Sequence, residues 1–479
     1  MKDNKNMIFY IVLTLIYIFP LILANVYYFD DMGRAMYGFG WSHGNDGRIL
    51  STLLMQMLSL NTTIGDLFPY PTILSALIFT TSGYFTCKIS GIEDQKKIKI
   101  CSFIPLVSPF ILQNLSYRYD CLPMSISVIA CIIPFLFFSN QYIFIILSII
   151  GLLVSAFTYQ SSISIYPMLC IIKSIRDLID SKHQEVIKNI FLSIVSFFIF
   201  LLMFKIIQIL FSIQINESRS DLVFSTSNPF ELIKNNIIRA KNHLSILNYG
   251  ITKFNAYGLS TLTFLSVILF LFSPVKIINK LILIFLLFGL PFISILIPLL
   301  LKTTHFAPRI LIGISFIPYG CLIFISRLSN KMCTYIGTFI FLTALPIMST
   351  YSNALLSQNK YELEMARRIF NKFEIKNQKI IVDGSPPESP ELLCAKRKFL
   401  FFKSMIFSYI KHPYWINHFL ALNGIIPSSD YGKHYIDGKE RESILNKKCL
   451  IHITYSNNNY IIRSDSKNVI IDFNKEKCD

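Results

Sequence analysis

Charged side chains gather in one stretch near the start of the chain, residues 27–51. Two adjacent carboxylates, Asp30 and Asp31, are followed by Arg34 and then Arg48. A carboxylate can act as a general base, and a guanidinium can neutralise a leaving phosphate. The stretch is therefore a candidate catalytic loop for a transfer reaction that releases a phosphate. A solvated loop with ordinary surface ion pairs is the competing interpretation.

Aromatic and polar residues accompany these charges. Trp41 and His43 lie inside the same stretch, and the segment 113–120 ends in Tyr117, Arg118 and Asp120. An arginine and an aspartate flanked by tyrosines suit contact with a phosphate or a sugar, through charged forks and ring faces. An Arg118–Asp120 pair that simply closes a loop is the structural alternative.

Two later loops have a similar character. Gln160 lies in a polar turn after an apolar segment, and His305 precedes Arg309 in a short basic loop. Arg309 begins the next apolar segment, where helix N-terminal amides and a guanidinium would together favour a phosphate. A histidine in such a loop is more often structural, so Arg309 is the stronger candidate.

The composition indicates a membrane protein. Of 479 residues, 53% are hydrophobic and only 15% are charged, well below the share of about one quarter that is usual in soluble domains. The formal net charge is +17, but the basic residues fall mostly in short loops between apolar segments. Membrane topology and lipid headgroups explain that pattern better than nucleic acid does, and nucleic acid is not an expected partner.

The apolar segments predict a polytopic α-helical fold with about eleven crossing segments, of roughly 20 residues each. Residues 7–24 are expected to be an uncleaved first helix, since no small-residue cleavage pattern follows them. Basic residues recur in alternate loops, which predicts a cytoplasmic N-terminus and places the loop 27–69 on the opposite face. Residues 49–58 have the spacing of an amphipathic helix, resting on that membrane face or packed on the bundle.

From residue 352 the chain becomes polar, which predicts a transmembrane catalytic domain over 1–351 and a small non-cytoplasmic α/β domain over 352–479. A helix is expected at 361–373, and strands at 380–382, 449–455 and 460–462. Cys394 and Cys449 could pair in an oxidising compartment. The tail also offers aromatic residues that either contact sugars or are buried: Tyr414, Trp415, His418 and Tyr431.

The motifs DDMGRAMYGFGW, NLSYRYD, YQSS and APRIL, in that order, resemble the serotype-converting O-antigen glucosyltransferases of the bacterial glucosyltransferase type II family. That family is similar in plan to the C-type glycosyltransferases, polytopic enzymes with a catalytic acidic residue in the first outer loop. The resemblance covers most of the membrane part, and the tail carries no matching motif.

The resemblance implies a polyprenyl-phosphate glucose donor and an acceptor sugar of the lipopolysaccharide O-antigen repeat, at the periplasmic face of the bacterial inner membrane. It implies inversion, from a β-linked donor to an α-linked product. Asp30 or Asp31 would be the base, and Arg34, Arg118 and Arg309 would stabilise the leaving polyprenyl phosphate. A glucose-lipid synthase and a flippase would act upstream.

The remaining candidate residues are assigned by chemistry. Arg48, Asp120, Gln160 and His305 are further candidates for the donor side, and Trp41 and Tyr117 for the acceptor side. No cofactor is expected because arginines can neutralise a phosphodiester, although Asp30 and Asp31 could hold a divalent cation. A transporter or flippase of lipid-linked sugars is the main alternative, but it would carry its polar groups within the membrane.

Overall fold

The structure is a computed structural model that describes residues 2–41, 46–213, 215, 221–245, 250–272, 277–303, 306–329, 331–372, 378–428, 434, 436 and 438–475. The chain forms two compact units. The first unit comprises Met1–Ile22, Phe39–Ser349 and Phe399–Phe401. The second comprises Leu23–Gly38, Thr350–Lys398 and Phe402–Asp479. The interpretation of 1–351 and 352–479 as separate domains stays a prediction.

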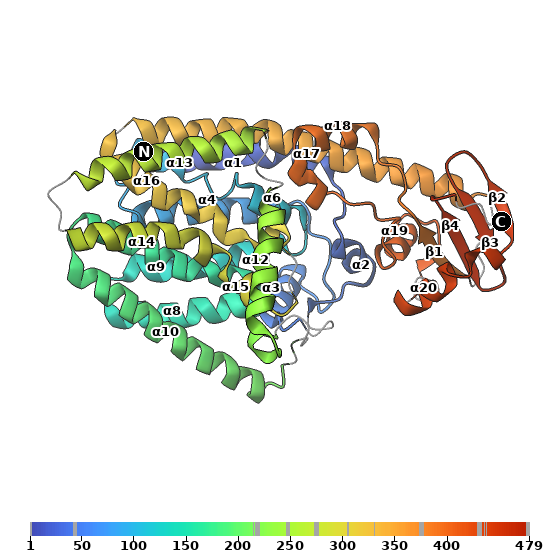
Figure 1. Cartoon of the computed structure of the whole chain (residues 1–479), viewed down its shortest axis with the longest axis horizontal. Coiled ribbons are helices and arrows are strands. Elements are labelled where there is room, and N and C mark those ends of the chain that lie inside the picture. The colour runs from blue at the N-terminus through green and yellow to red at the C-terminus, as the bar shows by residue number, and fades with distance from the viewer. Residues whose placement is uncertain are drawn as a thin grey trace. The chain divides into compact units, whose positions relative to one another are not determined.

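The elements described in the first unit are all helices (Figure 1). Its α-helices are α1 (Lys2–Ala24, which ends in the second unit), α3 (Ile49–Ser59), α4 (Tyr70–Ile89), α5 (Gln95–Cys101), α6 (Pro109–Ser116), α7 (Cys121–Ile132), α8 (Gln141–Thr158), α9 (Ile165–Ile179), α10 (His183–Leu210), α12 (Pro229–Ser245), α13 (Gly250–Leu271), α14 (Ile277–Ser294), α15 (Leu296–Leu300), α16 (Ile317–Leu328) and the first half of α17 (Met332–Phe370). Short 3-10 helices are η2 (Ile133–Phe137), η3 (Gln160–Ser164), η4 (Val223–Ser225), η5 (Pro308–Ile310) and η6 (Ile312–Phe316).

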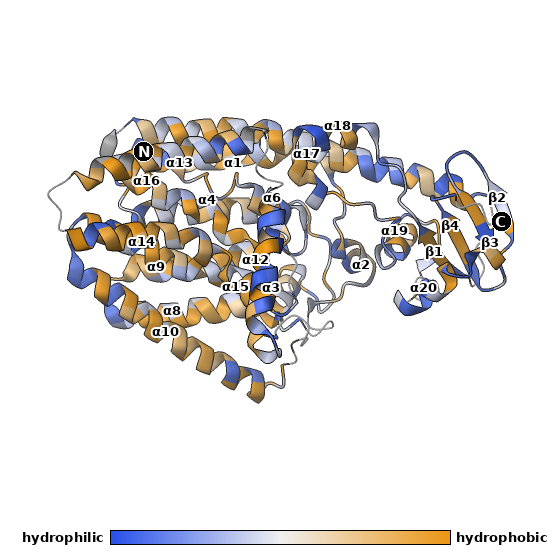
Figure 2. Ribbon diagram, viewed as in Figure 1, coloured by the Kyte–Doolittle hydropathy of each residue, from blue (hydrophilic) through white to orange (hydrophobic). Residues whose placement is uncertain are grey.

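Within the described residues, 5 helices are long and apolar enough to cross a membrane. They are Lys5–Ala24 of α1, α8, α10, α14 and α17. Figure 2 shows the predominantly hydrophobic ribbon of α8, α10 and α14. Several such helices indicate a multi-pass membrane protein.

The other predicted crossing segments form shorter elements. Pro109 begins α6, and Pro134 marks the change from α7 to the 3-10 helix η2. Proline has no backbone N–H to donate and clashes with the preceding turn, so these apolar runs do not continue as single long helices. The expectation of about eleven crossing segments therefore remains a prediction.

Small residues let the central helices of the first unit approach closely. A Cβ added at Gly151 of α8 would lie 2.2 Å from the Ala130 carbonyl oxygen of α7. A Cβ at Gly83 of α4 would lie 2.0 Å from the Ser102 carbonyl oxygen. In lipid, the hydrophobic effect does not drive helices to associate. Small residues stabilise helix pairs there because they let the backbones come into close contact. Helix α8 thereby packs closely on α7, and α4 packs closely on the backbone at Ser102.

The second unit is built on a mixed sheet. Its strands are β1 (Lys379–Asp383), β2 (Ile453–Ser456), β3 (Ile461–Ser464) and β4 (Asn468–Asp472), in the order β1-β4-β3-β2. Strand β1 is parallel to β4, while the β4–β3 and β3–β2 pairs are antiparallel. Its helices are α2 (Asp30–Tyr37), the second half of α17, α18 (Pro390–Lys398), α19 (Trp415–Leu422) and α20 (Gly438–Leu445), with η7 (Leu400–Ser404) and η9 (Lys448–Leu450).

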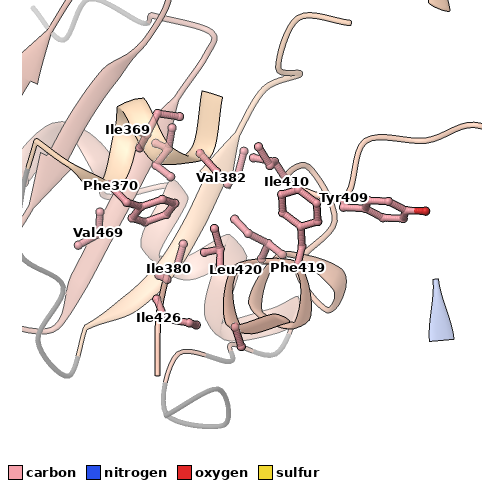
Figure 3. Close-up of a cluster of buried hydrophobic side chains, with 14 of the residues drawn as sticks. Ile369, Phe370, Ile380, Val382, Tyr409, Ile410, Phe419, Leu420, Ile426 and Val469 are labelled. Carbon is pink, nitrogen blue, oxygen red and sulfur yellow. The ribbon is translucent and has the colours of Figure 1, made fainter. Parts of the chain in front are cut away.

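Apolar side chains from both ends of the sequence form the core of this unit. Figure 3 shows Ile369 and Phe370 of α17, Val382 of β1 and Phe419 of α19 pointing into one cluster. Met32 of α2, which is 1% exposed, belongs to the same cluster. The acidic helix α2 is therefore folded into the core of the C-terminal region, although more than 300 residues separate them in sequence.

The tail differs from its prediction in several respects. The strand expected at 449–455 is β2, which begins only at Ile453, after the 3-10 helix η9. The helix expected at 361–373 is the end of the longer α17 and stops at Phe370. Strand β4 was not predicted, because its run of three apolar residues is bounded by Asn468 and Asp472 and is very short. Cys394 is an exposed free thiol, whereas Cys449 is disulfide-bonded, so these two cysteines are not paired with each other.

Candidate active site

The two adjacent aspartates begin α2 and have different environments. Asp30 is half-buried, whereas Asp31 is fully buried. The Tyr28 N–H donates to Asp31 Oδ2 at 3.2 Å, and the Asp31 N–H donates back to the Tyr28 carbonyl at 3.1 Å. The Asp31 carboxylate thus closes the first turn of the helix. Negative charge is favourable there because unpaired N–H groups point out of a helix N-terminus.

The residue before this pair has an unusual backbone. Phe29 has φ 49° and ψ −110°, a left-handed φ that a side chain with a Cβ rarely adopts. Its ring packs edge-on against Tyr409, Trp415 and Phe407, with centroids 5.7, 5.6 and 5.6 Å away. Such a conformation persists only where surrounding packing holds it, and it is typical of functional sites.

Helix α2 is fixed at its other end as well. The Gly38 N–H donates to the Arg34 carbonyl at 2.7 Å, and Gly38 has φ 62°, the left-handed conformation that commonly ends a helix. Arg34 is 5% exposed. Its position one helical turn after Asp30 and Asp31 puts it on the same face as the carboxylates.

A buried histidine lies on α19, which packs against α2. His418 is 1% exposed, and the hydrogen bond between its Nδ1 and the Tyr414 carbonyl is 2.9 Å long. Burial lowers the pKa of His418, and the negative charge of Asp30 opposes that shift. The imidazole is therefore held neutral next to the acidic helix, with Nδ1 donating.

The first unit contains a second group, which we call the arginine cluster. It consists of the predicted residues Trp41, Arg48, Tyr117, Asp120 and Arg309, together with Tyr159, which was not predicted. All of its members lie at or near helix ends. Arg48 precedes α3, Asp120 precedes α7, and Arg309 lies in η5. Helix α3 packs on α7 and α8, and α6 packs on η5, which brings these ends together.

Asp120 is the acceptor in the middle of the arginine cluster. It is 4% exposed, and its Oδ1 accepts hydrogen bonds from Trp41 Nε1 and, at 3.4 Å, from Arg48 Nη1. The Arg48 guanidinium also lies 5.2 Å from the centroid of the Tyr159 ring. The side chain of Arg48 keeps 24% of its surface exposed, so it remains accessible to a ligand.

Arg309 occupies the other side of the arginine cluster. Its guanidinium donates to the Tyr117 hydroxyl and its N–H donates to Gln113 Oε1 at 3.0 Å. The Tyr159 hydroxyl donates to the Arg309 carbonyl at 2.9 Å. Burial raises the pKa of Tyr159, so the hydroxyl keeps its proton for this bond. These contacts fix the backbone of the short helix η5.

Arg118 has a different partner from the one expected. Its Nη1 forms a 2.8 Å ion pair with Asp66, and its guanidinium lies 4.4 Å from the centroid of the Phe68 ring. Arg118 is 5% exposed, which leaves little of it for a ligand. The structural alternative for this arginine, a loop-closing pair, is thus realised with Asp66.

The structure places most of the predicted site residues, in two separate groups. Asp30, Asp31 and Arg34 belong to the second unit, and the arginine cluster belongs to the first. Gln160 begins η3, directly after Tyr159. His43, His305 and Tyr431 lie outside the described residues.

Sequence reasoning did not single out Asp66 or assign a role to Gln113, since both bind partners distant in the chain. Among the described residues, no group of three or more His, Cys, Asp or Glu side chains is arranged to hold a metal ion.

Comparison with known proteins gives a consistent result. A curated protein of Salmonella phage P22, described as an uncharacterised 55.3 kDa protein in the 5′ region of gtrB, is 30% identical over 250 residues. The alignment spans 50% of this chain and 50% of that protein. No solved structure matches the chain. The family model described as glucosyl transferase GtrII matches residues 19–319, a region that holds both the acidic helix α2 and the arginine cluster. The chain therefore belongs to the glucosyl transferase GtrII family.

Proposed function

We propose that this protein is an integral membrane glucosyltransferase. It moves glucose from a polyprenyl-phosphate glucose to a sugar of the lipopolysaccharide O-antigen repeat, at the periplasmic face of the inner membrane. The observation that carries the proposal is the family match over residues 19–319, which includes candidate groups for both halves of the reaction. The structure also has 5 candidate membrane spans among the described residues. This number agrees with the multi-pass fold that is expected of a C-type glycosyltransferase.

The proposed reaction is a direct displacement. The acceptor hydroxyl oxygen attacks the anomeric carbon, the bond from that carbon to the phosphate oxygen breaks, and polyprenyl phosphate leaves with the electron pair. The hydroxyl proton passes to a carboxylate. A single displacement inverts the anomeric carbon, so a β-linked donor gives an α-linked product.

Of the two adjacent aspartates, Asp30 is the better base. Asp30 is half-buried, so its carboxylate can be reached by an acceptor sugar. Asp31 is 0% exposed and one of its oxygens is already engaged by the Tyr28 N–H. A base must come within hydrogen-bonding distance of the proton that it removes. We therefore assign proton transfer to Asp30 and the closing of the helical turn to Asp31.

The leaving phosphate needs positive charge that is accessible. Arg48 keeps 24% of its side chain exposed, and Arg309, the middle residue of η5, is half-buried. Charge-assisted hydrogen bonds from guanidinium groups are short and strong, and they gain strength as charge develops on the phosphate. We assign donor-phosphate stabilisation to Arg48 and Arg309. Arg118, buried against Asp66, is assigned to loop structure.

The tail is proposed to contact the acceptor glycan from the periplasmic side. Tyr414 is 38% exposed and Phe407 is 46% exposed, and both belong to the ring cluster around Phe29 and Trp415. Exposed aromatic rings with polar neighbours suit the mixed surface of a sugar. The disulfide at Cys449 supports an oxidising compartment for the tail. The N-terminus is proposed to lie in the cytoplasm, because basic residues recur in alternate loops.

The test is glucosyl transfer in membranes supplied with polyprenyl-phosphate glucose and lipid-linked O-antigen. Wild type is compared with Asp30→Asn and Asp31→Asn, with each variant checked for expression and folding. Loss of a general base lowers the rate by about 10²–10⁴-fold, and this loss is expected for Asp30→Asn. Normal transfer by both variants would show that α2 has only a structural role. Wild-type membranes that move the lipid-linked sugar without transferring glucose would favour a flippase instead.

A further inference from the structure

A buried carboxylate that the proposed reaction does not use lies in the second half of α17. Glu362 is 0% exposed. Its Oε2 accepts from the Tyr409 N–H at 2.9 Å, and its Oε1 accepts from Gln358 Nε2 at 2.7 Å. The Ser408 side chain and the Ile410 backbone also hydrogen-bond to it. A buried carboxylate surrounded by donors in this way is fully engaged and holds its partners in place.

Three of the partners of Glu362, namely Ser408, Tyr409 and Ile410, belong to residues 405–410, which in turn hold the residues before α2. We call residues 405–410 the clamp. The Tyr409 hydroxyl donates to the Tyr27 carbonyl at 3.1 Å, and the Tyr28 hydroxyl donates to the Met405 carbonyl. The Tyr409 ring also packs on Phe29. The clamp therefore contacts three consecutive residues that end where Asp30 begins.

The clamp and α2 are linked by a continuous path of hydrogen bonds and backbone. Glu362 orients the Tyr409 backbone, Tyr409 fixes the carbonyl of Tyr27, and Tyr28 N–H meets Asp31 Oδ2. Every member of this path lies in the second unit. The strained φ of Phe29 needs such support, since a left-handed phenylalanine would otherwise relax.

We propose that Glu362 is a positioning residue: by holding the clamp, it fixes residues 27–29 and so aims the carboxylates of Asp30 and Asp31. This inference rests on the proposed function of those carboxylates. Glu362 does not touch the reacting atoms. Its removal is expected to lower kcat rather than the affinity for the donor, because the base is displaced while donor contacts are unchanged.

A matched control exists in the same unit. Asp472 of β4 is also 0% exposed and accepts backbone N–H groups, from Asn474 at 2.9 Å and Lys475 at 3.1 Å. It is the last residue of β4 and forms an ion pair with Lys448 at 3.5 Å, and none of these partners belongs to the clamp. Asp472→Asn therefore measures the general cost of altering a buried carboxylate in this unit.

The experiment compares Glu362→Gln, Tyr409→Phe and Asp472→Asn in the full-length protein. Tyr409→Phe removes only the hydroxyl that donates to Tyr27 and keeps the ring, so it is expected to fold. Amide hydrogen exchange of residues 27–37 and the kinetics of glucosyl transfer are measured on each. We expect faster exchange over 27–37 and at least a tenfold loss of kcat, with the donor KM within twofold, for the first two variants only.

Equal exchange over 27–37 in all three variants would overturn the positioning role. So would losses of kcat that merely follow thermal stability and are as large for Asp472→Asn. If wild type transfers no glucose, the proposed function is wrong, and Glu362 then has no role in positioning a catalytic base. Hydrogen exchange in that case still reports whether Glu362 orders residues 27–37, so the two failures are distinguishable.

Discussion

Asp30 and Asp31 are identical in type and adjacent in sequence, yet the fold gives them different surroundings. One carboxylate is half-buried, and the other is enclosed and bonded to the Tyr28 N–H. Environment, rather than residue type, assigns roles to paired carboxylates in enzymes. The sequence alone left the choice between these two residues open, because their burial is decided by how α2 packs on α19.

The arginines also differ in what they can do. Arg48→Ala and Arg309→Ala are expected to lower kcat/KM for the donor at least tenfold, because they remove guanidiniums that bind the donor phosphate and stabilise it as it leaves. Arg118→Ala is expected to lower stability by about 1–3 kcal/mol instead, because the buried guanidinium loses its packing on Phe68 and its charged hydrogen bond to Asp66. Transfer kinetics and thermal unfolding of detergent-solubilised protein measure the two effects. A kcat/KM for the donor that is lowered mainly by Arg118→Ala would reverse this assignment.

Titration of His418 makes the stability of the second unit depend on pH. Burial lowers the pKa of His418 below its ordinary 6.5, so the unfolded chain takes up a proton at a higher pH than the folded one. The folded state is then fully favoured above pH 6.5 and loses stability as pH falls toward the lowered pKa. His412, whose pKa burial also lowers, adds to the effect.

Glu362 acts in the opposite direction over the same range, because burial raises the pKa of its carboxyl to about 7 and the folded state then binds a proton that the unfolded chain does not. We therefore compare wild type with His418→Asn, which keeps Glu362 and can still donate an amide N–H near the Tyr414 carbonyl. Between pH 7.5 and 5.5, the melting temperature of the wild type is expected to fall relative to that of His418→Asn, as measured by thermal unfolding in detergent. The same change in melting temperature in the two proteins would mean that His418 is not a titrating group that affects stability.

At the scale of elements, α2 is an N-terminal helix that depends on a C-terminal core. Met32 is 1% exposed within that core, so Met32→Ala should destabilise the second unit by about 2–5 kcal/mol. Met57 of α3 is 66% exposed, and Met57→Ala is the control. Limited proteolysis of the region after residue 350 reports the change. Equal protease resistance in both variants would contradict the packing of α2 in this core.

Elements defined by local pattern were predictable, and elements defined by distant contacts were not. The amphipathic spacing at residues 49–58 correctly predicts α3, and the apolar run at 380–382 predicts β1. Strand β1 pairs with β4, which is about 90 residues away in the sequence. No local sequence pattern predicts that pairing. The same holds for the Asp66–Arg118 pair.

At the scale of the molecule, the two compact units are not continuous in sequence. Residues 23–38 fold with the tail, so an exchange of residues 352–479 alone between relatives would separate α2 from the core that it needs. We expect such chimeras to lose transfer. Exchanging residues 23–38 together with the tail should restore activity, and the glycosidic linkage of the product then reports whether the tail selects the acceptor. Full activity after a tail-only exchange would contradict this dependence.

Cys394 provides a natural reporter for the orientation of the chain. Among the cysteines in the part of the chain that the structure describes, it is the one with an exposed free thiol, on α18. A maleimide that cannot cross membranes should label it in cells whose outer membrane has been made permeable, if the tail faces the periplasm. Cys394→Ser serves as the blank. Sidedness can thus be determined on the native sequence, without fusing a reporter to either terminus or removing any other cysteine.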